Sequence, residues 1–209
     1  MIGAGVLTMQ TLKSIVLASA SQSRRALLEG AGVSFEAVAS DVDEDVIKRA
    51  AIAAGDGVAA TALALAREKA RFVQGSRPEA LIVGADQMLD LDGAWFDKPP
   101  DLAAARRQLI ALRGRRHTLH SALVLLGPAG ELWRHVEPAH LRMRDFSDEF
   151  LERYLDEVGE NALKSVGGYF LEGLGVQLFE SVEGDFFTVL GLPMTPLLAV
   201  LRREGALLT

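Results

Sequence analysis

The chain has 209 residues, a length that fits one domain, or one domain with two lobes. It is 49% hydrophobic and 24% charged, an ordinary globular composition that excludes a collagen, a coiled coil and a disordered tail. The net charge of −6 disfavours binding to the backbone of DNA or RNA, and the absence of cysteine excludes disulfides, thiolate metal sites and a cysteine nucleophile. Carboxylates and the four histidines remain as metal ligands, which favours Mg²⁺ or Mn²⁺ if a metal binds.

The first residues, 1–10, read as a loose leader, and Met9 is a candidate for the true start. The apolar stretch Ile15–Ala20 is shorter than the roughly 7–15 residues of a signal-peptide core, so we interpret Ser14–Ala18 as a buried strand. Because no run of about 18 apolar residues occurs, we predict no membrane span and a cytoplasmic protein.

Helices and strands are predicted to alternate along the rest of the chain. The predicted helices are one beginning at Arg24–Glu29, one of about ten residues after Asp45, Val58–Val73, Asp101–Leu112, one after Ser147, and Thr195–Glu204. The predicted strands are Phe35–Val38, Ala80–Gly84 ending at Asp86, the hairpin Gln87–Leu91 with Ala94–Phe96, and the hairpin His117–Leu126 with Glu131–Leu141. The glycine-rich stretch Ala162–Glu180 is expected to be irregular. With no repeat and no long linker, we predict a single domain over residues 1–209, an α/β fold whose mixed, twisted sheet is flanked by helices.

The small polar stretch Ser19–Ser23, followed by Arg24 and Arg25, is a candidate phosphate site. Small residues let the backbone approach an anion, a helix N-terminus favours negative charge, and arginine donates two hydrogen bonds at once to a phosphate. The alternative is a serine-capped surface helix with solvated arginines.

Two acidic positions are candidates for chemistry. Asp86, in Gly84-Ala85-Asp86-Gln87, follows a buried strand and could bind a cation or accept a proton from water, or it could only form a turn. The acidic stretch with Asp43, Glu44 and Asp45 could supply hard oxygen ligands, or it could only begin a helix.

Three further charged residues lie where their neighbours do not decide their role. Lys69 near the end of a long helix and Lys98 before Pro99 could each bind phosphate or be solvated. Glu172, on the glycine-rich stretch, could accept N–H groups of a ligand or face water. The arginines of residues 106–116 are interpreted as a solvated helix face rather than a nucleic-acid patch.

Several motifs in one order resemble the Maf family of nucleoside triphosphate pyrophosphatases, from about Ser14 to Leu201. They are Leu17-Ala18-Ser19-Ala20-Ser21 with Arg24-Arg25, Leu65-Ala66-Arg67-Glu68-Lys69-Ala70, Gly84-Ala85-Asp86, Lys98-Pro99 and Gly191-Leu192-Pro193.

The resemblance implies a fold similar to that of inosine triphosphatases, with two lobes and a central cleft, and cleavage of a nucleoside triphosphate between its α and β phosphates. It implies that Asp86 is the proton acceptor, that Glu44 and Asp86 hold a divalent metal, and that Ser19, Arg24, Lys69 and Lys98 bind phosphate, with Arg25 beside them. It also implies a homodimer. A group of cations around one carboxylate suits a highly charged anion, because phosphoryl transfer depends on positioning and charge neutralisation.

Base preference is expected to depend on Ser23, Gln87 and Glu172. The resemblance at Gln87 and at Glu172-Gly173-Leu174-Gly175 is to the 7-methyl-GTP members, and a carboxylate can accept both N–H groups of guanine. Those members carry Trp where this chain has Ser23, and the stretches Ser165-Val166-Gly167 and Asp97-Lys98-Pro99 also depart from the family pattern. We therefore expect 7-methyl-GTP as substrate, with broad or dTTP- and UTP-preferring hydrolysis, or a non-catalytic nucleotide-binding regulator of cell division, as alternatives. No stable nucleic-acid partner is expected.

Overall fold

The computed structural model describes residues 13–208, so the expected leader and the alternative start at Met9 lie outside the described residues. The helices are α1 (Gln22–Gly30), α2 (Glu44–Ala54), α3 (Val58–Gln74), α4 (Leu102–Leu112), α5 (Asp148–Val158), α6 (Phe186–Val189) and α7 (Met194–Arg203). The strands are β1 (Ile15–Ala18), β2 (Glu36–Ala37), β3 (Leu81–Leu91), β4 (Ala94–Phe96), β5 (Arg116–Gly127), β6 (Gly130–Met143) and β7 (Phe179–Glu183). Three short 3₁₀ segments, η1 (Gly159–Lys164), η2 (Val166–Gly168) and η3 (Leu174–Leu178), lie between α5 and β7.

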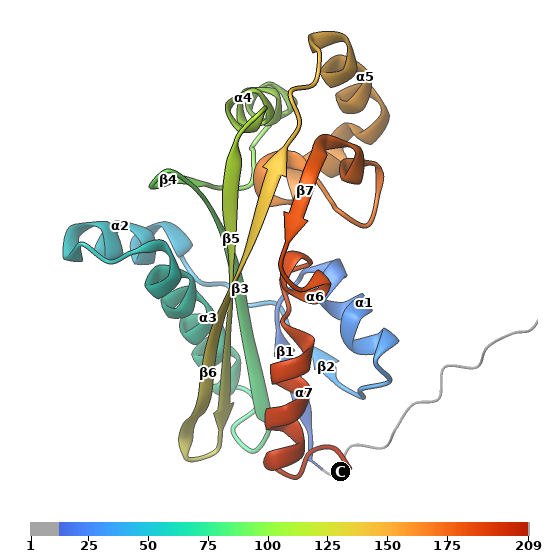
Figure 1. The fold of residues 1–209 in the computed structure, drawn as a ribbon. Helices are drawn as coiled ribbons and strands as arrows, with labels where there is room; N and C mark the ends of the chain where they lie inside the picture. The colour runs from blue at the N-terminus through green and yellow to red at the C-terminus, as the bar shows by residue number, and fades with distance from the viewer. Residues whose placement is uncertain (1–12, 209) are drawn as a thin grey trace, which may run out of the picture. The chain divides into compact units, whose positions relative to one another are not determined.

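Within residues 13–208, seven strands form one mixed sheet in the order β2-β1-β3-β5-β6-β7, with β4 paired to β3 (Figure 1). Strand β1 is parallel to β2 and β3, whereas β4 is antiparallel to β3 and β7 is antiparallel to β6. The predicted α/β class with a mixed sheet is confirmed. No helix in this part of the chain has the length and apolar character needed to cross a bilayer.

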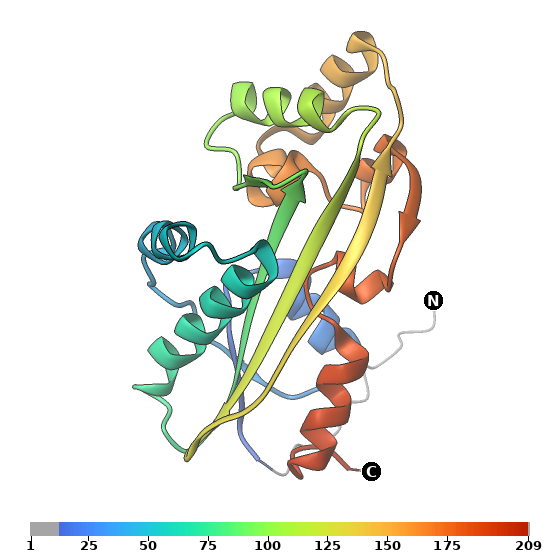
Figure 2. The same cartoon turned by 60° about the vertical axis from the view of Figure 1, so that its left-hand side comes forward.

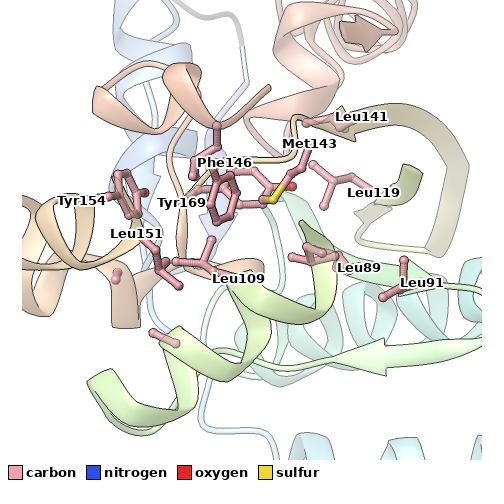
Figure 3. Close-up of a cluster of buried hydrophobic side chains, with 14 of the residues drawn as sticks. Leu89, Leu91, Leu109, Leu119, Leu141, Met143, Phe146, Leu151, Tyr154 and Tyr169 are labelled. Carbon is pink, nitrogen blue, oxygen red and sulfur yellow. The ribbon is translucent and has the colours of Figure 1, made fainter. Parts of the chain in front are cut away.

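The chain forms two compact units. Unit 1 contains the described residues up to Asp86, residues 121–137 and the residues from Gly191 onward; unit 2 contains residues 87–120 and 138–190. Each unit has a hydrophobic cluster of its own, and Figure 3 shows the one in unit 2, where Leu89, Leu109 and Phe146 lie together.

In unit 1, the period-two alternation of a strand sorts the side chains of β3 onto two faces. Leu81, Val83 and Ala85 join a cluster that also contains residues of α1 and α7. Gly84 lies on the other face, directly against α3. Figure 2 shows α3 and α7 on opposite sides of the sheet. The two faces of β3 in this unit are therefore both covered by helices.

The predicted end of the strand at Asp86, with a separate hairpin strand after it, was wrong. Strand β3 runs unbroken from Leu81 to Leu91, because no glycine or proline interrupts the apolar pattern after Asp86. Its register with β1 ends at Gly84 and its register with β4 begins at Leu89. Asp86 therefore lies within a long strand, after the residues that pair with β1 and before those that pair with β4.

Other boundaries differ less. Helix α1 begins two residues earlier than predicted, because Ser21 serves as its N-cap. The stretch expected to be irregular contains η1, η2 and η3 and leads into β7, which the sequence analysis missed. The sequence of β7, Phe-Glu-Ser-Val-Glu, has no period-two alternation of apolar residues, so the pattern that predicts a strand is missing.

Candidate active site

Asp86 is buried against α3. Its residue exposure is 6%, and strand alternation places it on the face of β3 that Gly84 also occupies. A Cβ at Gly84 would lie 2.1 Å from the backbone oxygen of Ala66 and 2.8 Å from the Cβ of Ala70, so only glycine permits α3 to pack this closely. The close packing brings Lys69 of α3 to Asp86, with 2.5 Å between Nζ and Oδ1.

Lys69 also contacts Glu44, with Nζ 2.7 Å from Oε1. Glu44 is the first residue of α2, and its position is fixed because Asp43 caps this helix by accepting the backbone N–H of Val46 at 3.0 Å. The acidic stretch thus begins a helix, as one interpretation expected, and also supplies a carboxylate to Lys69. The same ammonium group links the two carboxylates that were predicted as metal ligands.

A second lysine lies beside Glu44. The Nζ of Lys48 is 3.6 Å from Glu44 Oε2, and the Lys48 side chain is only 15% exposed. Lys48 was not predicted as a site residue, although its spacing of four residues from Glu44 within a helix places the two side chains on one helix face.

Arg24 is buried and makes three hydrogen bonds within unit 1. Its Nε donates to the carbonyl oxygen of Gly191 at 2.8 Å, and its Nη1 donates to the Ala85 carbonyl at 2.9 Å and to Ser19 Oγ at 3.1 Å. Arg24 therefore fixes the loop after β1, the strand that carries Asp86 and the chain before α7. Its Nη2 takes no part in these three bonds.

Ser19 is also buried. Its Oγ accepts hydrogen bonds from Arg24 Nη1 and from the backbone N–H of Ser21, the latter at 3.2 Å. Because a hydroxyl has two lone pairs, its O–H remains as a donor for an anion. Ser21 accepts the backbone N–H of Arg24 at 3.4 Å, so α1 is also serine-capped, as the alternative interpretation expected.

Burial raises the pKa of Asp86, while the positive charges of Lys69 and Arg24 oppose this shift. Burial also lowers the pKa of Arg24, and the Asp86 and Glu44 carboxylates oppose that shift. A carboxylate with a raised pKa is a better proton acceptor than an exposed one. The geometry thus combines a base with neighbouring cations.

The remaining predicted residues are distributed over both units. In unit 1, Ser23 and Arg25 are partly buried on α1, and the buried Nε of Arg25 has no hydrogen-bond partner among residues 13–208. In unit 2, Lys98 is exposed between β4 and α4, and Glu172 is exposed between η2 and η3.

Gln87 follows Asp86 on β3, so its side chain points to the opposite face of the strand. Its Nε2 donates to the carbonyl oxygens of Thr188 at 3.1 Å and Val189 at 3.0 Å. In this conformation the amide nitrogen of Gln87 binds the backbone just before the end of unit 2.

The described residues contain no group of three or more His, Asp or Glu side chains arranged to hold a metal ion. Glu44 and Asp86 form a carboxylate pair on either side of the Lys69 ammonium group. Two carboxylates suit Mg²⁺ when substrate phosphates and water complete its coordination. The donor set thus fits a cation that binds together with a phosphorylated ligand.

Comparison with known proteins places these residues in a family. The family model described as "Maf-like protein" matches residues 14–204. A "Nucleoside triphosphate pyrophosphatase" of Granulibacter bethesdensis is 48% identical over 193 residues, covering 92% of this chain and 98% of that protein. A "7-methyl-GTP pyrophosphatase" of Rhizobium meliloti is 49% identical, covering 92% and 97% of the two chains.

Among solved structures, the Mycobacterium abscessus "Nucleoside-triphosphatase / dITP/XTP pyrophosphatase" aligns over 92% of this chain and 94% of that chain. The TM-score is 0.47 and the identity 15%, a distant similarity that does not bear on function. The family model matches nearly all the described residues. This chain also aligns with the two relatives named above over almost their whole lengths. This chain belongs to the Maf-like protein family.

Proposed function

We propose that this protein is a nucleoside triphosphate pyrophosphatase that cleaves the bond between the α and β phosphates. The observation that carries the proposal is the buried Asp86 carboxylate, held 2.5 Å from Lys69 and close to Arg24. The names of relatives at 48% and 50% identity, both nucleoside triphosphate pyrophosphatases, support it.

In the proposed reaction, Asp86 takes a proton from the water that attacks the α-phosphorus. Its raised pKa makes it a suitable base, while Lys69 keeps it ionised and orients it. Water adds to the α-phosphorus as the bond to the bridging oxygen breaks, and pyrophosphate leaves with that oxygen. The products are a nucleoside monophosphate and pyrophosphate.

The phosphate-binding role is assigned to Ser19, Arg24, Lys69 and Lys98, with Arg25 beside them. Ser19 contributes its O–H, and Arg24 contributes Nη2. We add Lys48, because a lysine side chain that is only 15% exposed beside Glu44 places a further positive charge near Lys69.

Glu44 and Asp86 would hold the divalent cation, Mg²⁺ or Mn²⁺, that the reaction is proposed to use. A bound cation would neutralise charge on the phosphates and polarise the bond that breaks.

For the base, we propose a preference for 7-methyl-GTP, read mainly by Glu172. A carboxylate accepts the two N–H donors of guanine, and the positive charge of the methylated ring strengthens such bonds. Several relatives are named 7-methyl-GTP pyrophosphatase, including one at 49% identity. Others have the general name, so broad or dTTP- and UTP-preferring hydrolysis is the second candidate.

The test is to incubate the full chain with Mg²⁺ or Mn²⁺ and a panel of triphosphates, and to identify products by chromatography. Pyrophosphate with the monophosphate supports the proposal, whereas tight triphosphate binding without release supports a non-catalytic regulator. If 7-methyl-GTP has no advantage in kcat/KM over UTP and dTTP, the proposed base preference is wrong.

Asp86→Asn should lower kcat by about 10²- to 10⁴-fold, because it removes the general base. The matched control is Asp90→Asn on the same strand, whose carboxylate accepts the backbone N–H of Gly93 in the β3–β4 turn. The control should keep nearly full activity. An Asp86→Asn variant that keeps more than about a tenth of wild-type activity would exclude Asp86 as the base.

A further inference from the structure

The backbone conformation is constrained at both ends of the segment that carries Glu172. Gly167 and Gly168 both have positive φ, 78° and 75°, and turn the chain sharply before Tyr169. At the other end, a Cβ on Gly175 would lie 2.5 Å from the carbonyl oxygen of Phe170. The loop between Phe170 and Gly175 is thus fixed in shape by its backbone.

Two buried hydroxyl groups hold the start of this loop in unit 2. Tyr154 of α5 donates from Oη to the carbonyl oxygen of Gly168 at 3.0 Å. The Oη of Tyr169 shares a hydrogen bond of 2.8 Å with Nε2 of His117 on β5. Tyr154 and Tyr169 are each 3% exposed, and Figure 3 shows both within the apolar cluster.

His117 is an unexpected residue at this position. It is 2% exposed, its ring lies 6.0 Å from that of Phe179, and its Nδ1 has no hydrogen-bond partner in the described part of the chain. An apolar ring of similar size would avoid the free-energy cost of this unpaired nitrogen. The contact that such a ring would lose is the hydrogen bond to Tyr169.

We infer that His117, Tyr169 and Tyr154 are positioning residues for Glu172, holding the loop so that the carboxylate can select the base. This inference rests on the proposed function. Tyr169 precedes Glu172 by three residues, and the loop between them is closed by the hydrogen bond from the Gly173 N–H to the Phe170 carbonyl at 3.2 Å. A shift of Tyr169 therefore moves Glu172 with it.

The kinetic test uses Tyr169→Phe and Tyr154→Phe, which remove one hydroxyl each and keep the rings. Each should raise KM for 7-methyl-GTP by about five- to tenfold with kcat within about twofold, and should leave UTP kinetics unchanged. The control is Leu91→Ala, in the same hydrophobic cluster on β3. A merely structural role would lower kcat for both substrates, which is the result expected for the control.

A double-mutant cycle with Glu172→Gln sharpens the test. If Tyr169 acts through Glu172, the double variant should have no higher KM for 7-methyl-GTP than Glu172→Gln alone. Fully additive increases would show that Tyr169 acts independently of Glu172, and would overturn the inference.

Amide hydrogen exchange gives a readout that does not need activity. Exchange over residues 169–175 should accelerate in both tyrosine variants but not in Leu91→Ala. Unchanged exchange would overturn the positioning role even if the enzyme hydrolyses 7-methyl-GTP. Absence of triphosphate hydrolysis by the wild-type chain would instead overturn the proposed function, so the two failures are distinguishable.

Discussion

At the scale of single residues, the positive charge of Lys69 influences the pKa of the Asp86 carboxyl group that it contacts. The Lys69 ammonium group opposes the burial that raises the pKa of Asp86. Removing this charge should raise that pKa further, so the carboxyl group stays protonated to a higher pH.

Lys69→Gln should therefore move the acid limb of the kcat/KM profile to higher pH, besides lowering the maximum rate. The profile is measured from about pH 4 to 9 on the residual activity. Arg71→Gln is the control, because Arg71 lies on the same helix but pairs with Glu68 at the surface. If the acid limb of the kcat/KM profile lies at the same pH in wild type and in Lys69→Gln, this result would contradict a base role for Asp86.

Lys48 provides a second prediction at this scale. Lys48→Ala should lower kcat/KM for triphosphates about tenfold, which corresponds to about 1.4 kcal/mol, mainly through a higher KM. Arg49→Ala removes a neighbouring positive charge that is exposed on α2 and should have little effect. If the two variants lose the same amount, Lys48 contributes only to the general field of the helix.

At the scale of elements, the approach of α3 to β3 decides the geometry of the site. Gly84→Ala would place a Cβ 2.1 Å from the Ala66 carbonyl, so α3 must move away from the strand. Overpacking of this kind costs about 1–3 kcal/mol in unfolding free energy.

Gly84→Ala should also lower kcat more than its stability loss explains, because Lys69 moves with α3. Denaturant unfolding and steady-state kinetics on the same samples test this. Gly30→Ala is the matched control, since a Cβ there has nothing within 4 Å. An active Gly84→Ala variant of normal stability would show that this close packing is not needed.

The buried His117 of β5, which shares a hydrogen bond with Tyr169, predicts a pH-dependent stability. Burial lowers the pKa of His117 to about 4 from its usual 6.5. The unfolded chain therefore binds a proton on His117 that the folded chain does not, between these two values. Stability should fall as pH drops from about 6.5 to 4, by about 3 kcal/mol from this residue, and His117 contributes no pH dependence above that window.

Urea unfolding of wild type and His117→Gln at several pH values measures this contribution as a difference. Asp86 has the opposite effect, because its pKa is raised in the folded chain and its protonation at low pH therefore stabilises the folded state. This effect is present in both proteins, so it cancels in the difference. If the free energy of unfolding changes with pH in the same way in both proteins, the buried His117 does not have the lowered pKa on which the prediction depends.

At the scale of the whole molecule, charge separates substrate binding from nucleic-acid binding. The chain carries a net charge of −6, while the cations near Asp86 are buried or partly buried. Non-specific nucleic-acid binding depends on neutralising many phosphates at once.

Duplex DNA or RNA at about 0.15 M salt should therefore neither inhibit hydrolysis nor change in fluorescence anisotropy when the protein is added. Inorganic tripolyphosphate should inhibit hydrolysis, because it presents the same anionic chain as the substrate. Strong inhibition of hydrolysis by DNA would contradict the prediction that nucleic acid does not bind at this site. The homodimer and the cytoplasmic location implied by the sequence stay predictions.

The sequence by itself determined much of the secondary structure and the family. Apolar periodicity predicted α3 within one residue at its end, and the Asp92-Gly93 turn predicted the short β4. The ordered motifs predicted membership of the Maf family, which the match over residues 14–204 confirmed. These features are local or depend on residue order, so they can be read along the chain.

Only the tertiary structure decided which of these side chains meet. Arg24 binds the carbonyl oxygens of Ala85, 61 positions away, and of Gly191, 167 positions away, so one side chain joins three segments that are distant in the sequence. Lys69 reaches Asp86 because glycine and alanine allow α3 to pack against β3, and Lys48 joins them through Glu44. Such contacts depend on how closely distant elements pack, and that distance is set by side-chain volumes from several segments at once, which no single stretch of sequence contains.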